Sequence, residues 1–271
     1  MSRPRWFVAL VRAAFPGRFV AARATRLPLL GGLLDRWLFG GDQIVYLPRD
    51  GVIPVGERIE ALGEMALPSA LVERLIRQAN TRWIMDACIC RQSNDCQDYA
   101  HDLGCLFLGE AAAGINPRLG RPVSEAEALA HVARCREAGL VHMVGRNKLD
   151  TLWLGVGPGD RLLTICNCCP CCCLWRVLPH VAPQIGAKVQ AVPGVRVTVT
   201  ERCAGCGTCT EGVCFVEAIR LEGGRAVIGP DCRGCGRCVE VCPQGAIELT
   251  IEDEDFLASA LEALSGVVDV T

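Results

Sequence analysis

Cysteine spacing constrains this chain more than any other feature of its sequence. The chain has 271 residues and 19 cysteines, and eighteen of them lie in tight groups between Cys88 and Cys242. The exception is Cys135, which we expect to be a small packed side chain on a helix. The placement of the other eighteen determines which kinds of site this chain can build.

So many cysteines are typical either of a disulfide framework in a small secreted domain or of metal binding in a reducing compartment. Here the number is odd, the chain is long enough for two or three small domains, and residues 1–30 interleave arginines with short apolar patches instead of forming a signal peptide. Adjacent cysteines such as Cys171, Cys172 and Cys173 also suit disulfide pairing poorly. We therefore predict a metal-loaded protein of the cytoplasm.

Eight cysteines near the carboxyl end form an internal repeat. The first copy is Cys203-x2-Cys206-x2-Cys209-x4-Cys214, and the second is Cys232-x2-Cys235-x2-Cys238-x3-Cys242-Pro243. A [4Fe-4S] cubane takes four thiolates, and cysteines three residues apart in a tight loop can hold three of its corners. Glycines within both loops permit a left-handed backbone that brings N–H groups close to sulfur. The fourth corner must come from elsewhere.

This repeat resembles a bacterial-type ferredoxin with two [4Fe-4S] clusters, over about residues 196–250. The resemblance implies that each copy supplies the fourth ligand of the other copy's cluster. One cluster would take Cys203, Cys206, Cys209 and Cys242, and the other would take Cys232, Cys235, Cys238 and Cys214. The first copy departs from the pattern, because four residues precede Cys214 and Phe215 replaces the proline. Structural zinc is the alternative, which the duplicated order of eight cysteines disfavours.

Ten further cysteines precede the repeat. We predict metal ligands among Cys88, Cys90, Cys96, Cys105, Cys166, Cys168, Cys169 and Cys171, and candidate catalytic thiols in Cys172 and Cys173. So many crowded thiols would not ionise together without cations. We expect at least one further iron–sulfur cluster here, with the surplus thiols serving a second cluster, an unusual cluster or a thiol redox reaction. A structural role for most of the thiols is the open alternative.

Local patterns predict how these ten cysteines converge. Strands are expected over 83–90 and 161–167, so that Cys88 and Cys90 share one face of the first strand and Cys166 and Cys168 one face of the second. Pro170 suits the first position of a helix reaching about His180, and its N-terminus would favour thiolate at residues 171–173. Two strand ends and a helix start would then meet at one site.

Other elements are expected from pairing and capping patterns. We predict a strand pair within 43–55, a helix from an N-cap at Ser69 to about Asn80, and a helix over 125–138 with a capping box of Ser124 and Glu127. We also predict a hairpin of 150–156 with 161–167, a second hairpin over 218–228, a linker at Pro193-Gly194, and a short apolar helix after 252–255.

The fold class is α+β: a basic N-terminal segment (1–50), a Cys-rich α/β domain (51–195), the ferredoxin-like domain (196–250) and a C-terminal helix (251–271).

Residues 1–50 carry eight arginines against three aspartates. The segment also carries large aromatic side chains: Trp6, Phe7, Phe15, Phe19, Trp37 and Phe39. Such a basic amphipathic segment can lie on an anionic membrane surface or dock on an acidic partner. The alternative is that it forms two ordinary helices packed on the body, with their arginines in water. Membrane attachment through residues 1–40 therefore remains an open expectation beside the cytoplasmic location.

Three functions fit these features. The first is electron transfer, in which the ferredoxin-like domain relays electrons between a redox partner protein and the N-terminal site. The second is an iron–sulfur reductase acting on a disulfide, a corrinoid or another low-potential substrate. The third is a redox-sensing regulator that binds DNA through the 125–138 helix and the 150–167 hairpin. The near balance of 28 basic and 30 acidic residues makes nucleic acid an unexpected partner, and no glycine loop for a nucleotide is present.

The whole chain is also similar to proteins described only as 4Fe-4S dicluster domain-containing. A CxCR segment such as Cys88-Ile89-Cys90-Arg91 and a CNCCxCCC segment such as residues 166–173 precede the ferredoxin repeat in them. The similarity implies that both groups of cysteines work as one unit, and it supplies no substrate. So many oxidisable thiols lead us to expect an anaerobic host.

Overall fold

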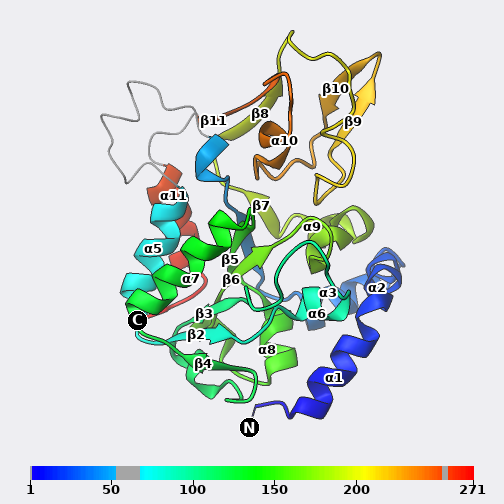
Figure 1. Cartoon of the computed structure of the whole chain (residues 1–271). Helices are drawn as coiled ribbons and strands as arrows, with labels where there is room; N and C mark the ends of the chain where they lie inside the picture. Colours follow the sequence, from blue (N-terminus) through cyan, green and yellow to red (C-terminus); the bar gives the residue numbers. More distant parts are fainter. Residues whose placement is uncertain (1, 53–67, 252–255) are drawn as a thin grey trace.

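The computed structural model describes residues 2–52, 68–251 and 256–271. A mixed α/β body is built on a seven-stranded sheet, and a smaller part with two two-stranded sheets lies at one end of it (Figure 1). No helix in the described ranges is long and apolar enough to cross a membrane.

The large sheet has the strand order β4-β2-β3-β6-β5-β1-β7. Every neighbouring pair is antiparallel except β1 with β7, which is parallel. The strands are β1 (Gln43–Tyr46), β2 (Arg82–Met85), β3 (Leu106–Leu108), β4 (Gly120–Pro122), β5 (Val141–Arg146), β6 (Leu163–Cys168) and β7 (Val189–Ala191). Strand β6 is therefore central, between β3 and β5, and it carries Cys166 and Cys168 into the middle of the domain.

Side chains alternate across this sheet, so that each face has its own core. Val45 and Val144 pack with helices α5 (Pro68–Gln78), α7 (Glu125–Glu137) and α11 (Phe256–Ser265). Tyr46 and Met143 face the opposite side. The helices on that side are α1 (Arg5–Ala14), α2 (Arg18–Ala24), α3 (Leu30–Leu38), α6 (Ile89–Ser93), α8 (Lys148–Leu154) and α9 (Pro183–Gly186) (Figure 1). Cys166 and Cys168 belong to this second side, whereas Cys96, Cys169 and Cys171 pack with Cys135 of α7.

Several predicted elements are confirmed. Helix α7 begins after Ser124, whose side chain accepts the Glu127 N–H while the Glu127 carboxylate accepts the Ser124 N–H. Helix α11 packs into the core through Ala260 and Leu264. In the smaller part, β9 (Ile219–Glu222) and β10 (Arg225–Ile228) form the predicted hairpin. There β8 (Val195–Val199) pairs with β11 (Ile247–Ile251), and α10 spans Arg237–Glu240.

The predicted hairpin of 150–156 with 161–167 is wrong in its first half. Residues Lys148–Leu154 form helix α8, because the Asn147 side chain caps it by accepting the Leu149 N–H. The second half is strand β6, which pairs with β3 and β5. The DNA-binding interpretation depended on this hairpin and loses its support.

Two predictions around the cysteines are also wrong. The strand over 83–90 ends at Met85, and Ile89–Ser93 is helix α6, so Cys88 is its N-cap residue and Cys90 lies in its first turn. The helix expected from Pro170 is a 3₁₀ helix that starts only at Leu174, where the Cys173 sulfur accepts the Trp175 N–H. Cys171 and Cys172 therefore precede that helix, whereas Cys173 is its N-cap residue.

Smaller differences concern two turns. Ser69 lies within α5 rather than before it, and its backbone N–H donates a hydrogen bond to the Asp50 carboxylate. Gln43–Tyr46 is a strand that pairs with β5 and β7, while a 3₁₀ turn follows at Asp50–Val52. The rest of the predicted strand pair, from residue 53, lies outside the described residues.

Candidate metal centres and thiol-lined cavity

The two cysteine loops of the smaller part have matching backbones. Gly205 and Gly207 in the first loop have φ of 67° and 80°, and Gly234 and Gly236 in the second have 66° and 80°. At Gly205 a Cβ atom would lie 2.1 Å from the Gly224 carbonyl oxygen, so only glycine fits. These loops provide the thiol donors and close-packed backbone that an iron–sulfur cluster requires.

Cys214 occupies the same position in its copy as Cys242 does in the other. The Cys214 sulfur accepts the Ala218 N–H at 3.3 Å, and the Cys242 sulfur accepts the Ala246 N–H at 3.3 Å. The longer spacing before Cys214 and the Phe215 replacement therefore leave the local geometry of the repeat intact.

The eight cysteines act on one another in two sets. Burial raises the pKa of Cys235 to about 12, and the nearby Cys214 and Cys232 charges raise it further. Burial also raises the pKa of Cys209, with Cys242, Cys203 and Cys206 as the neighbouring charges. The ferredoxin resemblance implies the same two ligand sets, but Cys209 of the first set also acts on Cys238 of the second. Cys206 is exposed, so the first set reaches the protein surface.

The ten N-terminal cysteines fall into two groups. Four sulfur atoms lie within 4.8 Å of one another, and we call them the four-thiol group: Cys96, Cys169, Cys171 and Cys172. Their donor chemistry and mutual spacing could hold a metal ion. Cys172, predicted from the sequence to be a candidate catalytic thiol, thus lies among candidate ligands.

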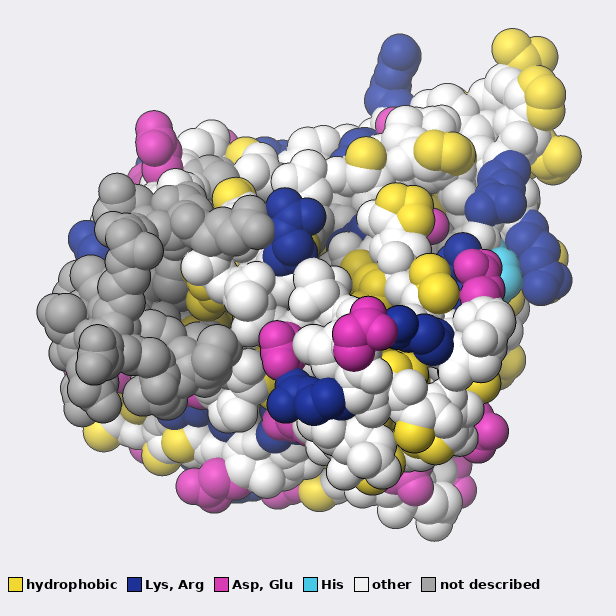
Figure 2. Space-filling view, turned by 90° about the horizontal axis from the view of Figure 1, so that it is seen from above, with side chains coloured by type: hydrophobic (Ala, Val, Ile, Leu, Met, Phe, Trp, Pro, Cys, Tyr) yellow, Lys and Arg dark blue, Asp and Glu magenta, His cyan; other side chains and the backbone are white. Residues whose placement is uncertain are grey.

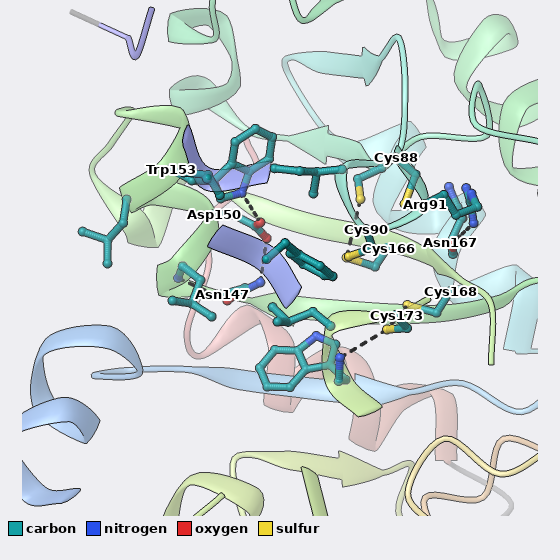
Figure 3. Close-up of a pocket in the computed structure, with 18 of the residues that line it drawn as sticks. Cys88, Cys90, Arg91, Asn147, Asp150, Trp153, Cys166, Asn167, Cys168 and Cys173 are labelled. Carbon is teal, nitrogen blue, oxygen red and sulfur yellow. Dashed lines mark hydrogen bonds between the residues drawn. The ribbon is translucent and has the colours of Figure 1, made fainter. Parts of the chain in front are cut away.

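The other six line a cavity of about 380 Å³ together with Cys169 of the four-thiol group (Figure 3). We call these six the cavity thiols: Cys88, Cys90, Cys105, Cys166, Cys168 and Cys173. Cys166 and Cys168 both lie on β6, two residues apart, so their side chains share one face of the strand as the sequence predicted. The Cys105 and Cys166 sulfur atoms are 3.6 Å apart, and those of Cys168 and Cys173 are 3.3 Å apart. The remaining wall is mostly apolar, with Phe7, Phe15, Trp37, Trp153 and Trp175 among its side chains.

Hydrogen bonds decide which of these thiols can ionise. The pKa of Cys88 is lowered to about 6, chiefly because its sulfur accepts a hydrogen bond from Cys90; burial opposes this and Arg91 supports it. The pKa of Cys105 is raised well above its usual value because this thiol donates to Cys166, and burial raises it further. Metal binding at this cavity would therefore release protons.

Burial, followed by the neighbouring thiols, opposes ionisation of Cys171 and Cys172. Burial raises the pKa of Cys172 to about 12, and its hydrogen bond with Cys96 acts in the same direction. Burial and the nearby Cys169 charge also raise the pKa of Cys171. The thiolate character expected of a helix N-terminus is therefore not found at these two residues.

Arg91 is a buried cation beside both thiol groups. Its side chain is fully buried and donates to the backbone carbonyls of Asn167 and Leu103. Burial lowers its pKa, but the Cys88, Cys169 and Cys105 charges outweigh burial and raise it. The position of Arg91 in the CxCR segment was visible in the sequence, whereas its complete burial was not.

Tyr46 links the cavity to the smaller part of the molecule. This side chain is fully buried, and its ring centroid lies 5.5 Å from that of Phe215, next to Cys214. Burial raises the pKa of Tyr46 well above its usual value, followed in order by the charges of Cys173, Cys168 and Cys235. Tyr46 therefore lies between the cavity thiols and the second cysteine loop. Its sequence context, a strand-like run, offered no sign of this role.

The remaining candidates are structural. Cys135 is fully buried on α7 with its sulfur 3.8 Å from His131 Nε2, which confirms the predicted packing role. His142 is buried and its Nδ1 is 2.8 Å from Asn167 Oδ1. His101 Nε2 lies 3.1 Å from the Cys96 carbonyl oxygen. Both histidines are thus hydrogen-bonded within the protein.

Comparison with known proteins finds one family. Residues 227–248 match the Fer4 family, described as a 4Fe-4S binding domain. This segment contains the second cysteine loop and Cys242, so an iron–sulfur cluster is the cofactor supported for this part of the chain. No curated protein and no solved structure gives a significant match.

Proposed function

We propose that this protein transfers electrons between two [4Fe-4S] clusters in its ferredoxin-like part and a further redox centre held by the cavity thiols. The observation that carries the proposal is the buried contact through Tyr46 and Phe215. This contact joins three cysteines of the second loop's set to the cavity thiols Cys168 and Cys173 within one apolar cluster: Cys214, Cys232 and Cys235. A buried, apolar path of this kind has a low local dielectric constant and separates the centres from solvent.

The proposed electron route runs from the exposed cluster at the protein surface to the buried cavity thiols. A redox partner protein would exchange one electron at a time with the cluster of Cys203, Cys206, Cys209 and Cys242, because Cys206 is exposed. The electron would pass to the second cluster and then past Tyr46 to the cavity centre. Arg91, buried between the two thiol groups, would offset part of the negative charge that the thiolates and the added electron bring.

Iron and sulfide analysis on anaerobically prepared full-length protein tests the cavity centre. Two cubanes account for about eight irons per chain, and we expect more than eight. Replacing Cys166 and Cys168 by alanine should return the iron content to about eight and remove one electron paramagnetic resonance signal. The matched control is Cys135→Ala, another buried cysteine in the same domain, which should keep both. About eight irons in the unsubstituted protein, with no signal lost in the double variant, would refute the cavity centre.

A reductase is a second candidate because of the size of the cavity. Its volume of about 380 Å³ lies within the range of small-molecule sites, and its apolar wall leaves room for a ligand beside the thiols. Reduction of a disulfide there would consume two electrons, delivered singly through the clusters, and two protons to give two thiols. Anaerobic turnover of a small disulfide or a corrinoid with a chemical reductant would support this activity. Reversible reduction of the clusters without turnover would instead indicate a protein that only carries electrons.

A further inference from the structure

Exposed apolar side chains are concentrated at one place in this protein. Nine large hydrophobic side chains are exposed in the described part of the chain, and eight of them lie between residues 6 and 37: Trp6, Leu10, Val20, Leu27, Leu29, Leu30, Leu33 and Trp37. The ninth, Leu221, is on the ferredoxin-like part. We call these eight side chains the α1–α3 surface. Such a concentration marks an interaction site.

The helices expose these side chains while burying others. In α1, Phe7 and Val11 line the thiol cavity, whereas Trp6 and Leu10 are 69% and 58% exposed. In α3, Leu30, Leu33 and Trp37 follow helical spacing and are all exposed. The structure thus agrees with the idea that these helices pack on the body, yet it leaves a second apolar side without a cover in the described residues.

The charge of this segment favours an anionic surface. Residues 1–40 contain seven arginines and a single acidic residue, Asp35, which is paired with Lys188. Arg5, Arg23 and Arg36 are exposed, and in the described residues none of them has a carboxylate at ion-pair distance. Hydrophobic and basic side chains project together on the right of Figure 2, the side on which α2 lies in Figure 1.

The turn between α2 and α3 carries the most exposed of these side chains. Leu29 is 95% exposed and has a φ of 67°, a backbone region that a leucine rarely adopts. Leu27 and Leu30 flank it and are exposed as well. Apolar side chains that project singly from a turn suit a fluid lipid surface, which needs no complementary pocket. Tryptophans such as Trp6 and Trp37 prefer the same interface.

We propose that the α1–α3 surface docks on an anionic lipid bilayer. The leucines and tryptophans enter the headgroup region, and Arg5, Arg23 and Arg36 contact the acidic headgroups. Trp37 also lines the thiol cavity although it is 63% exposed, so it marks the mouth of that cavity. Docking would turn this mouth towards lipid, where an apolar ligand could enter. The proposal does not depend on electron transfer.

Vesicle co-sedimentation of the full-length, cluster-containing protein tests this inference. We expect binding to vesicles of equal parts phosphatidylcholine and phosphatidylglycerol, with at least about tenfold weaker binding to pure phosphatidylcholine or in high salt. The double variant Leu10→Glu and Leu33→Glu should lose at least about tenfold in affinity, and so should Arg5→Glu combined with Arg36→Glu. Leu221→Glu is the matched control and should bind as the unsubstituted protein does. Equal iron contents will show that the variants fold.

Two results would overturn the proposal. One is equal binding of the unsubstituted protein to charged and neutral vesicles, or no binding to either. The other is sedimentation of the free protein as a dimer that Leu33→Glu separates, without vesicle binding, because the surface would then be covered by a second copy. If the leucine double variant fails to fold, the arginine double variant alone tests lipid binding, because its substitutions replace exposed charges and remove no apolar contact.

Discussion

Single residues define the cluster loops. At Gly205 two constraints coincide: φ is 67°, and an added Cβ would lie 2.1 Å from the Gly224 carbonyl oxygen. Gly212 has the same φ of 67° but has nothing within 4 Å of an added Cβ. The two glycines therefore separate the effect of backbone strain from that of close packing.

Gly205→Ala should remove one cluster, about four irons per chain, because the clash pushes the loop away from the β9–β10 turn. Gly212→Ala should keep all the iron and lower stability by only about 1–2 kcal/mol, the cost of a side chain at positive φ. Iron and sulfide content, with the midpoint of thermal unfolding, measures both effects. Equal iron loss in the two variants would show that strain alone is responsible.

His142 links stability to pH. Burial lowers its pKa from the ordinary 6.5 to about 4, so the folded protein keeps it neutral while the unfolded chain takes up a proton near pH 6.5. Between these values the unfolded state binds more protons. The stabilising contribution is therefore complete above about pH 6.5 and is lost as the pH falls to about 4, a change of about 3 kcal/mol.

His142→Asn should flatten this dependence, because asparagine can still donate to Asn167 and does not titrate. We expect the difference in unfolding free energy between pH 7 and pH 5 to be smaller in the variant than in the unsubstituted protein. Chemical denaturation at several pH values measures it. Parallel pH profiles for the two proteins would contradict the assignment to His142.

Among the elements, helices α7 and α8 both begin at a side-chain cap, but the two capping residues make different further contacts. Ser124 caps α7 at the surface of the domain. Asn147 caps α8 and also donates to the Asp150 carboxylate, which is buried and accepts from Trp153 and Thr164 as well. Helix α8 therefore depends on a buried polar network beside the cavity.

Asn147→Ala should destabilise the protein more than Ser124→Ala. Loss of the Ser124 cap costs about 1 kcal/mol. Loss of Asn147 removes a cap and leaves a buried carboxylate with one donor fewer, for a total of about 2–3 kcal/mol. Thermal unfolding midpoints of the two variants, measured side by side, show which substitution destabilises the protein more. A larger effect at Ser124 would mean that the Asp150 network is not important for stability.

The elements also show where sequence patterns succeed. The capping box of α7 and the Gly223-Gly224 hairpin were predicted correctly, because each depends on residues close together in the chain. Residues 150–156 were predicted as a strand from their apolar run, but the Asn147 cap and the turn after Gly155 make them a helix. A short apolar run fits a buried strand and a buried helix equally well.

At the scale of the whole molecule, the two parts are joined around Tyr46. Its hydroxyl group is buried and has no hydrogen-bond partner within the described residues. Around it, Arg237 donates to the Gly139 carbonyl oxygen at 2.8 Å, and Arg49 pairs with Glu240. The junction is thus an apolar centre with polar contacts at its edge.

Tyr46→Phe should keep electron exchange between the two parts unchanged and should leave stability equal or higher, because it removes an unsatisfied buried hydroxyl. Tyr46→Ala should slow the exchange and lower stability by about 3–5 kcal/mol through loss of an aromatic ring from the core. Rapid-freeze paramagnetic resonance after reductant mixing follows the exchange. Unchanged kinetics in Tyr46→Ala, in protein with full iron content, would exclude a route past this ring.

The sequence by itself determined the cysteine loops of the repeat, since three cysteines, their glycines and their turns lie within seven residues and need only local geometry. It also determined that the earlier thiols could not all ionise. Only the tertiary structure arranged those ten cysteines as a four-thiol group and six cavity thiols, with Cys169 of the four-thiol group also lining the cavity. That division depends on β6 pairing with β3 and β5, on α6 beginning after Cys88, and on helices α1 and α3 closing the wall. Contacts between residues so distant in the chain follow from packing, which no local spacing encodes.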